Sequence, residues 1–459
     1  MPVVDVKDRH TRLDLGQRLE YLEIKDEAAW PWEVSSLPGW QVAHTDYPSF
    51  GLDSSSHWFR FELRNISGEI QLVMLDLRHP LLDELDVFVL DKGRIKRVWN
   101  TGLQRGVGSR PYPAKSFVVP LYLDVDENIQ LYFRAKSDSY LMFPLHLQDI
   151  RLFANQQAMG KMLMGLVSGS FLLVGLYALL MYIFIRERRF IYYGFFCLSL
   201  NVTIWILKGY AGIYEQLPAW FDSVRFLLVA AAILLGSLLL SSLDMFRIWL
   251  SNKIRLLTKA CLVAVAACGV LLCFIPLTAA IYLTFACFCL VTLLAVFYTL
   301  LFTHKGGWLQ RLYCYSWLGF MLGAICYFAN RFAWITSEWV GDYLLSLFST
   351  MAAFLLTFSL AYRTYQEKKG RIRAKRQATE GLKRYFDLYH SATEGLFTST
   401  LEGQLLAANS AYCRMFGYDD VQTMASTIGR TTHMLYVSPT ERDDMLAALF
   451  SSSKDGVRR

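Results

Sequence analysis

Seven long apolar segments follow one another between residues 162 and 362, and they constrain the fold of this chain more than any other feature. A helix needs about 20 mostly apolar residues to cross the hydrocarbon core of a bilayer. The segments are centred on residues Met162–Ile185, Phe190–Leu207, Phe226–Leu243, Leu257–Leu277, Ala279–Phe302, Leu312–Phe332 and Tyr343–Tyr362. Residues 156–363 are therefore predicted to form a bundle of seven transmembrane helices.

Positive charge is concentrated in alternate loops between these segments. Groups of Lys and Arg follow the first, third, fifth and seventh segments, whereas the other loops hold only Lys208, Arg225 and Arg331. Cytoplasmic loops retain Lys and Arg, so we expect the C-terminus in the cytoplasm and the N-terminal domain outside it. This topology explains the net charge of +7, and no nucleic-acid partner is predicted.

Residues 1–14 contain no apolar stretch of the kind found in a secretory signal. A domain that lies outside the cytoplasm normally needs such a signal. We therefore expect that the natural start lies upstream, that a signal was trimmed, or that the first span itself translocates the domain.

The cysteines avoid the polar parts of the chain. None of the nine lies within the first 160 residues, and all except Cys413 fall in the apolar middle. Neither a disulfide framework nor a Cys/His spacing typical of zinc can be recognised. We interpret them as small apolar residues packed between helices, and we predict no metal site and no cofactor.

Residues 1–155 have the pattern of short β-strands. In His57–Asn65, apolar and charged side chains alternate, with Phe59, Phe61 and Leu63 on one face. Turn signals such as Asp91-Lys-Gly separate further strand candidates at Ile70–Leu77, Leu85–Leu90, Phe117–Leu123 and Ile129–Arg134. Many short strands at regular spacing predict an all-β sandwich of the jelly-roll type.

Five tryptophans lie in this domain, at positions 30, 32, 40, 58 and 99. Exposed aromatic rings can stack on sugars, but large aromatic side chains more often fill a core. We take Trp58, Arg60 and Arg110 as candidate contacts for a small ligand such as a carbohydrate. The domain shows no catalytic constellation, because its histidines are not accompanied by a Ser or Cys nucleophile in a recognisable motif, and no catalytic residue is predicted.

The segment after the last span divides into a basic helix and a small domain. Residues 364–385 are predicted to form a helical linker. In residues 386–459, strands are expected at Gly395–Thr398 and Gln404–Ala407, and Asn409 is placed to cap the following helix. Gly417 has the usual position for ending that helix.

This last segment resembles the first half of a PAS domain, a small sensor and dimerisation module. The resemblance rests on Ala408-Asn409 and on Phe416-Gly417-Tyr418, with Gly429 and Pro439 at matching places. A complete PAS domain is longer, so residues 386–459 are expected to be a truncated α+β module. The sparse apolar positions of the linker fit either a signalling helix that pairs in a dimer or a solvated connector. With the PAS segment as a dimerisation module, we expect a homodimer formed through the linker and the PAS segment.

The order of the parts resembles the bacterial seven-transmembrane receptors with diverse intracellular signalling modules. In the outer domain the resemblance rests on His57–Asn65, on Pro80–Val87 and on Thr101-Gly102 with Arg110. It covers residues 10–363 and implies a jelly-roll domain similar to carbohydrate-binding modules. It also implies a location in the bacterial inner membrane and a cytoplasmic output, commonly a diguanylate cyclase or a histidine kinase.

Other membrane proteins fit the sequence less well. A retinal-binding pump needs a lysine within its last span, and Tyr343–Tyr362 has none. A transporter usually carries ionisable groups at mid-membrane, whereas Arg225, Asp244, Arg331 and Asp342 all lie near span ends. The chain itself has no cyclase or kinase motif. An alternative is that it is the N-terminal part of a membrane-bound cyclase or sensor kinase.

Overall fold

The computed structural model describes residues 1–7, 12–24, 30–52, 55–137, 140–210, 223–247, 250–305, 307–331, 335, 340–400 and 404–428, and isolated positions between 437 and 448. The chain divides into two compact units, residues 1–361 and residues 362–459.

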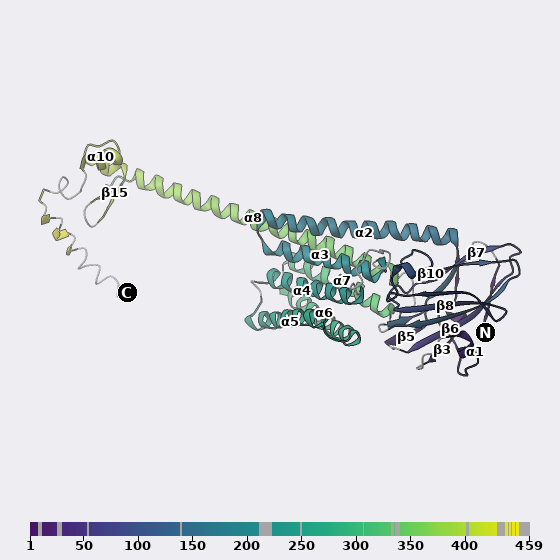
Figure 1. The fold of residues 1–459 in the computed structure, drawn as a ribbon. Helices are drawn as coiled ribbons and strands as arrows, with labels where there is room; N and C mark the ends of the chain where they lie inside the picture. Colours follow the sequence, from purple (N-terminus) through teal and green to yellow (C-terminus); the bar gives the residue numbers. More distant parts are fainter. Residues whose placement is uncertain are drawn as a thin grey trace. The chain divides into compact units, whose positions relative to one another are not determined.

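The N-terminal domain is built almost entirely of strands (Figure 1). Two short 3₁₀ turns, Gly16–Arg18 and Val107–Ser109, and one short helix, α1 (Pro31–Ser35), interrupt them. The strands are β1 (Val3–Val6), β2 (Leu13–Asp14), β3 (Glu20–Ile24), β4 (Gln41–Val42), β5 (Ser49–Leu52), β6 (Ser56–Asn65), β7 (Gln71–Leu77), β8 (Glu84–Asp91), β9 (Arg94–Thr101), β10 (Phe117–Leu123), β11 (Asn128–Lys136), β12 (Tyr140–Met142) and β13 (Leu145–Asp149).

Two sheets enclose the core of this domain. The larger has the order β4-β3-β6-β11-β8-β9, with β1 added in parallel beside β6, and the smaller has the order β10-β7-β13-β2. Phe59, Phe61 and Leu63 of β6 are fully buried between the sheets against side chains of β7 and β10. The β-sandwich predicted from the alternation in this strand is confirmed.

The predicted strands are present at their expected places, and the turn after β8 has the expected chemistry. Lys92 and Gly93 both have positive φ, 47° and 76°, as a tight hairpin between β8 and β9 requires. The sequence pattern missed β9 because its core-facing and outward positions do not alternate regularly in hydrophobicity. It also missed the short strands β1 to β5.

Among the described residues, seven helices are long and apolar enough to cross a membrane, as predicted. They are α2 (Ile150–Ile185), α3 (Arg188–Leu207), α4 (Ser223–Met245), α5 (Asn252–Leu271), α6 (Leu277–Lys305), α7 (Trp308–Arg331) and α8 (Leu345–Ser391), the last preceded by a π-helical turn at Val340–Leu344. The predicted end of the sixth span, Phe332, lies outside the described residues.

Both end helices are longer than their apolar segments. Helix α2 begins at Ile150, twelve residues before the apolar run at Met162, so the expected domain boundary at residue 155 lies within it. Helix α8 continues through the expected linker 364–385 to Ser391 without a break. Hydropathy detects the part of a helix that lipid surrounds, but it does not detect a polar extension of the same helix.

The cations at the end of the bundle beside the β-sandwich are tied to backbone carbonyls. Lys208 Nζ donates to the carbonyl oxygen of Gly341 at 3.1 Å. Arg225 Nη1 donates to the carbonyl oxygens of Leu272, at 2.9 Å, and Ile275, at 3.2 Å. The carbonyls of Leu272 and Ile275 lie just past the C-terminal end of α5, where a positive charge is favourable.

The second unit holds the end of α8 and a small α+β region. Strands β14 (Phe397–Ser399) and β15 (Leu405–Ala408) pair, and helices α9 (Ser410–Met415) and α10 (Val421–Ile428) follow. Asn409 caps α9, since its side chain accepts the amide of Tyr412, and Gly417 follows the helix with φ of 79°. The two positions Gly429 and Pro439 of the sequence pattern lie outside the described residues.

Candidate functional site

Trp58 and Arg60 lie two residues apart on β6, and so on the face of the large sheet that is turned away from the core. Trp58 is fully buried and stacks on Phe88 of β8, with ring centroids 5.8 Å apart. Arg60 Nε donates to Glu20 Oε2 at 2.7 Å, and the guanidinium lies 3.9 Å from the ring centroid of Trp40. Both candidate side chains are therefore engaged with other protein groups.

A row of aromatic rings leads from Trp58 through Phe88 to the surface of the domain. Trp30 and Trp32 stack with centroids 5.0 Å apart and planes 6° from parallel, and the ring of Trp30 lies 6.1 Å from that of Phe88. Trp30 and Trp32 are 41% and 56% exposed. We call the group Trp30, Trp32, Trp40 and Arg60 the tryptophan platform.

Helix α1 sets the geometry of this platform. Trp30 is its N-cap, Pro31 is its first residue, and the Glu33 carboxylate accepts the backbone amide of Trp30 at 3.1 Å. Trp-Pro-Trp-Glu is thus a signal for a short helix that places two tryptophans outside the sheet. Trp30 and Trp32 were not among the predicted contact residues, although the Trp-Pro-Trp-Glu signal is visible in the sequence.

Arg110 does not belong to this group. It lies in the connection between β9 and β10, where its Nη1 donates to the carbonyl oxygen of Ala114 at 2.5 Å and its guanidinium lies 4.6 Å from the ring centroid of Phe117. Burial lowers the pKa of the Arg110 guanidinium to about 10. Its buried Nε has no hydrogen-bond partner among the described residues. An arginine in such surroundings is suited to an anionic partner.

The segment Pro80–Val87 is locked to the turn that contains Thr101-Gly102. The amide of Leu103 donates to the carbonyl oxygen of Leu82 at 2.9 Å, and a Cβ on Gly102 would lie 2.1 Å from the carbonyl oxygen of Asp83. Asp86 is an acceptor for both Arg105 and Arg134. The two sequence motifs Pro80–Val87 and Thr101-Gly102 therefore contact each other directly at the start of β8.

Two family models match this chain. The model described as "7TMR-DISM extracellular 2" matches residues 16–149, and the model described as "7TM diverse intracellular signalling" matches residues 160–363. The chain belongs to the family of seven-transmembrane receptors with diverse intracellular signalling modules. It is thus a multi-pass membrane protein with the architecture of a transmembrane sensory receptor.

No curated protein matches this receptor. Neither family match extends beyond residue 363, so the PAS resemblance of residues 386–459 stays a prediction. Among the described residues, no three His, Cys, Asp or Glu side chains are grouped closely enough to hold a metal ion.

The β-sandwich of the receptor, called the outer domain here after the family model that matches it, is joined to α2 without a linker. Strand β13 ends at Asp149, whose carboxylate caps α2 by accepting the amide of Arg151 at 2.8 Å. Phe153 in the first turn is buried against Met74 and Val118 of the small sheet. The start of α2 is therefore packed directly on the small sheet.

Two further contacts join the outer domain and the bundle. Arg78 Nη2 donates to Gln156 Oε1 of α2 at 2.7 Å. At the end of α3, Gly209 has φ of 79°, and a Cβ there would lie 2.4 Å from both the carbonyl oxygen of Lys115 and the Cβ of Pro80. The backbone of the bundle thus lies directly against the outer domain at Gly209.

Within the bundle, α3 connects these contacts to the last span. The hydroxyl of Tyr193 donates to the carbonyl oxygen of Ala353 at 2.6 Å and lies 2.5 Å from Thr357 Oγ1, both on α8. Ser242 of α4 similarly reaches the hydroxyl of Tyr313 on α7 at 3.1 Å. Such hydrogen bonds hold neighbouring membrane helices in a defined register.

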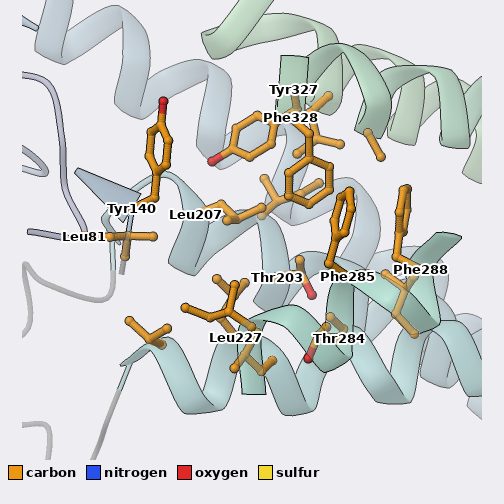
Figure 2. Close-up of a pocket in the computed structure, with 18 of the residues that line it drawn as sticks. Leu81, Tyr140, Thr203, Leu207, Leu227, Thr284, Phe285, Phe288, Tyr327 and Phe328 are labelled. Carbon is orange, nitrogen blue, oxygen red and sulfur yellow. The ribbon is translucent and has the colours of Figure 1, made fainter. Parts of the chain in front are cut away.

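A cavity of about 590 Å³ lies where the bundle meets the outer domain. Helices α3, α4, α6 and α7, the start of α8, residues His79–Leu81 and Tyr140 line it. Figure 2 shows Leu81 and Tyr140 at one end of this junction cavity and Phe288 at the other. This cavity was not predictable from the sequence, because an apolar residue that lines a cavity looks the same in sequence as one that faces lipid.

Proposed function

We propose that this receptor binds a small ligand outside the cytoplasm with its β-sandwich and relays the signal through the helix bundle to a cytoplasmic output. The observation that carries the proposal is the continuous path from β13 into α2, and from α3 through Tyr193 to α8. A ligand shifts a receptor only through different affinities for its two states. A sandwich packed directly on the first span is well suited to such a shift.

The tryptophan platform is the proposed ligand site. Because Trp30 and Trp32 stack on each other, the outer face of Trp32, the more exposed ring, is the flat apolar surface on which a sugar ring can stack. Arg60 with Glu20 supplies polar groups on the same side of the domain. In this arrangement Trp58 supports the platform from below through Phe88 and does not itself contact the ligand. Arg110 remains a separate candidate for an acidic group.

The remaining parts of the proposal concern the other end of the bundle. We place the receptor in a bacterial inner membrane with its β-sandwich outside and its C-terminus in the cytoplasm. Residues 364–459 form a signalling helix and a PAS module that pair in a homodimer and control a cyclase or kinase output. The charge asymmetry of the loops and the continuity of α8 to Ser391 support these assignments.

The test is a chimera in which residues 1–385 are joined to a diguanylate cyclase output and screened with glycans and small metabolites. We expect at least one ligand to change product formation several-fold. Trp32→Ala should abolish this response, because it removes the more exposed ring of the platform.

Tyr122→Ala is the matched control, since Tyr122 is also an exposed aromatic residue, 60% exposed, but lies on β10 of the other sheet. Its response should equal that of the unmodified chimera. If every active ligand works equally well after residues 10–150 are deleted, the spans do the sensing and the proposal is wrong.

A further inference from the structure

The junction cavity is too large to be a packing defect. Protein interiors are close-packed, with few voids larger than a water molecule, whereas this cavity has a volume of about 590 Å³. Small-molecule sites have volumes of about 300–1,000 Å³. The cavity therefore has the size of a binding site for one small molecule.

Its walls are apolar, with mostly aliphatic side chains and a group of aromatic rings at one end. Phe328 of α7 contacts Phe285 and Phe288 of α6, with ring centroids 5.8 Å and 5.6 Å apart (Figure 2). Two lining hydroxyls, those of Thr203 and Thr284, donate to carbonyl oxygens of their own helices at 2.8 Å and 2.9 Å. The other polar side chains of the lining are His79, Tyr140, Tyr282 and Tyr327, against thirteen aliphatic ones. Because most of the wall offers water no hydrogen-bond partner, an apolar occupant suits it better.

The position of the cavity indicates where an occupant comes from. All of its helical residues lie in the half of the bundle nearer the β-sandwich. Tyr282 and Phe285 line the cavity and are still 60% and 42% exposed at the surface of α6. The wall that α6 contributes is therefore in contact with the apolar surface of the bundle, which lipid covers in a membrane.

We propose that the junction cavity binds a single hydrocarbon chain that enters from the bilayer, either a free fatty-acid-like amphiphile or one chain of a membrane lipid. This site is separate from the tryptophan platform and does not depend on it. Residues Pro80 and Leu81 of the lining continue directly into β8 of the large sheet. Occupancy of the cavity therefore changes the contact between the outer domain and the helices.

The test is photolabelling of the full chain in nanodiscs of phosphatidylethanolamine and phosphatidylglycerol. Palmitic acid with a terminal diazirine is used in one arm, and phosphatidylethanolamine with a diazirine on one acyl chain in the other. Labelled peptides are mapped by mass spectrometry. We expect saturable labelling of the cavity-lining residues of α6 and α7, competed by unlabelled palmitic acid in the first arm and by unlabelled phosphatidylethanolamine in the second.

Two variants fill the cavity and one serves as control. Ala324→Trp on α7 and Ala231→Phe on α4 add volume at lining positions, and each should reduce this labelling at least fivefold. Ala286→Trp places the same bulk on the exposed face of α6 and should change labelling less than twofold. Thermal unfolding of all three in the same nanodiscs checks that each variant is folded.

The two arms identify the source of the chain. Labelling by the fatty acid indicates a free amphiphile, and labelling by the phospholipid indicates a bilayer lipid; either supports the site. Labelling that does not saturate, or that persists in folded Ala324→Trp and Ala231→Phe, would overturn it. None of these outcomes depends on a ligand of the outer domain, so the proposed function can fail or hold independently.

Discussion

At the scale of single residues, Gly209 shows how a contact between two domains can require glycine at one position. Its φ of 79° is a conformation that glycine adopts most readily, and the space where a Cβ would lie is already occupied by Pro80 and Lys115. Gly106 has a nearly identical φ of 75° but nothing within 4 Å of its missing Cβ. A Cβ at Gly106 would therefore meet only the strain of the positive φ, whereas a Cβ at Gly209 would meet this strain and a steric clash as well.

We predict that Gly209→Ala destabilises the receptor more than Gly106→Ala. The strain of a positive φ should destabilise both variants by about 1 kcal/mol, and overpacking should add about 2 kcal/mol for Gly209→Ala. The measurement is thermal unfolding of the full chain in detergent. Equal losses in the two variants would mean that the outer domain does not lie against Gly209 in solution.

At the scale of elements, Asn409 joins one helix end, one strand and the next helix. Its Nδ2 donates to the carbonyl oxygens of Tyr389 and Glu394, at 3.0 Å and 2.8 Å, and its Oδ1 accepts the amides of Leu396 and Tyr412, at 2.9 Å and 2.8 Å. The side chain is fully buried, and these bonds use its full donor capacity. One asparagine therefore fixes how α8 meets the α+β region.

We predict that Asn409→Ala destabilises this region by about 3 kcal/mol, because it leaves two carbonyls and two amides unpaired in a buried site. Hydrogen exchange of the Leu396 and Tyr412 amides in the full chain measures the effect, and both should lose protection. Asp420→Ala, which removes the exposed cap of α10, is the control and should leave these two amides protected. Unchanged protection in Asn409→Ala would contradict the prediction.

At the scale of the whole molecule, the distribution of charge predicts which way the receptor crosses the membrane. Consecutive spans run in opposite directions, so the C-terminal ends of α2, α4 and α6 lie at the end of the bundle away from the β-sandwich (Figure 1). Most of the Lys and Arg near the span ends are on this side. That asymmetry predicts that this end of the bundle faces the cytoplasm.

We predict that alkaline phosphatase fused at Arg363 is inactive and that green fluorescent protein fused at the same residue is fluorescent, since Arg363 follows the seventh span. Fusions in the loop between α5 and α6, on the other side, serve as the control and should give the reverse result. Phosphatase activity without fluorescence at Arg363 would show that the orientation is inverted.

The sequence by itself determined the features that depend on local composition and period. Seven spans follow from runs of apolar residues, and the strand at His57–Asn65 follows from alternation, because both patterns reflect what surrounds each residue along one element. The capping of α9 by Asn409 was equally predictable, since a cap needs only its neighbours in sequence. The helical extension of the last span over residues 364–385 was also predictable, but the sequence did not show that the helix continues to Ser391, into the segment assigned to the α+β module.

Only the tertiary structure decided which side chains meet across the fold. Trp58 lies beneath Phe88, and the exposed ring pair is Trp30 with Trp32, because strands distant in sequence cover one tryptophan and leave the others at the surface. The contact of Gly209 with Pro80 and the junction cavity likewise join residues from the outer domain and several helices. Hydrophobicity says that a side chain avoids water, but it does not say whether protein, lipid or a ligand replaces the water.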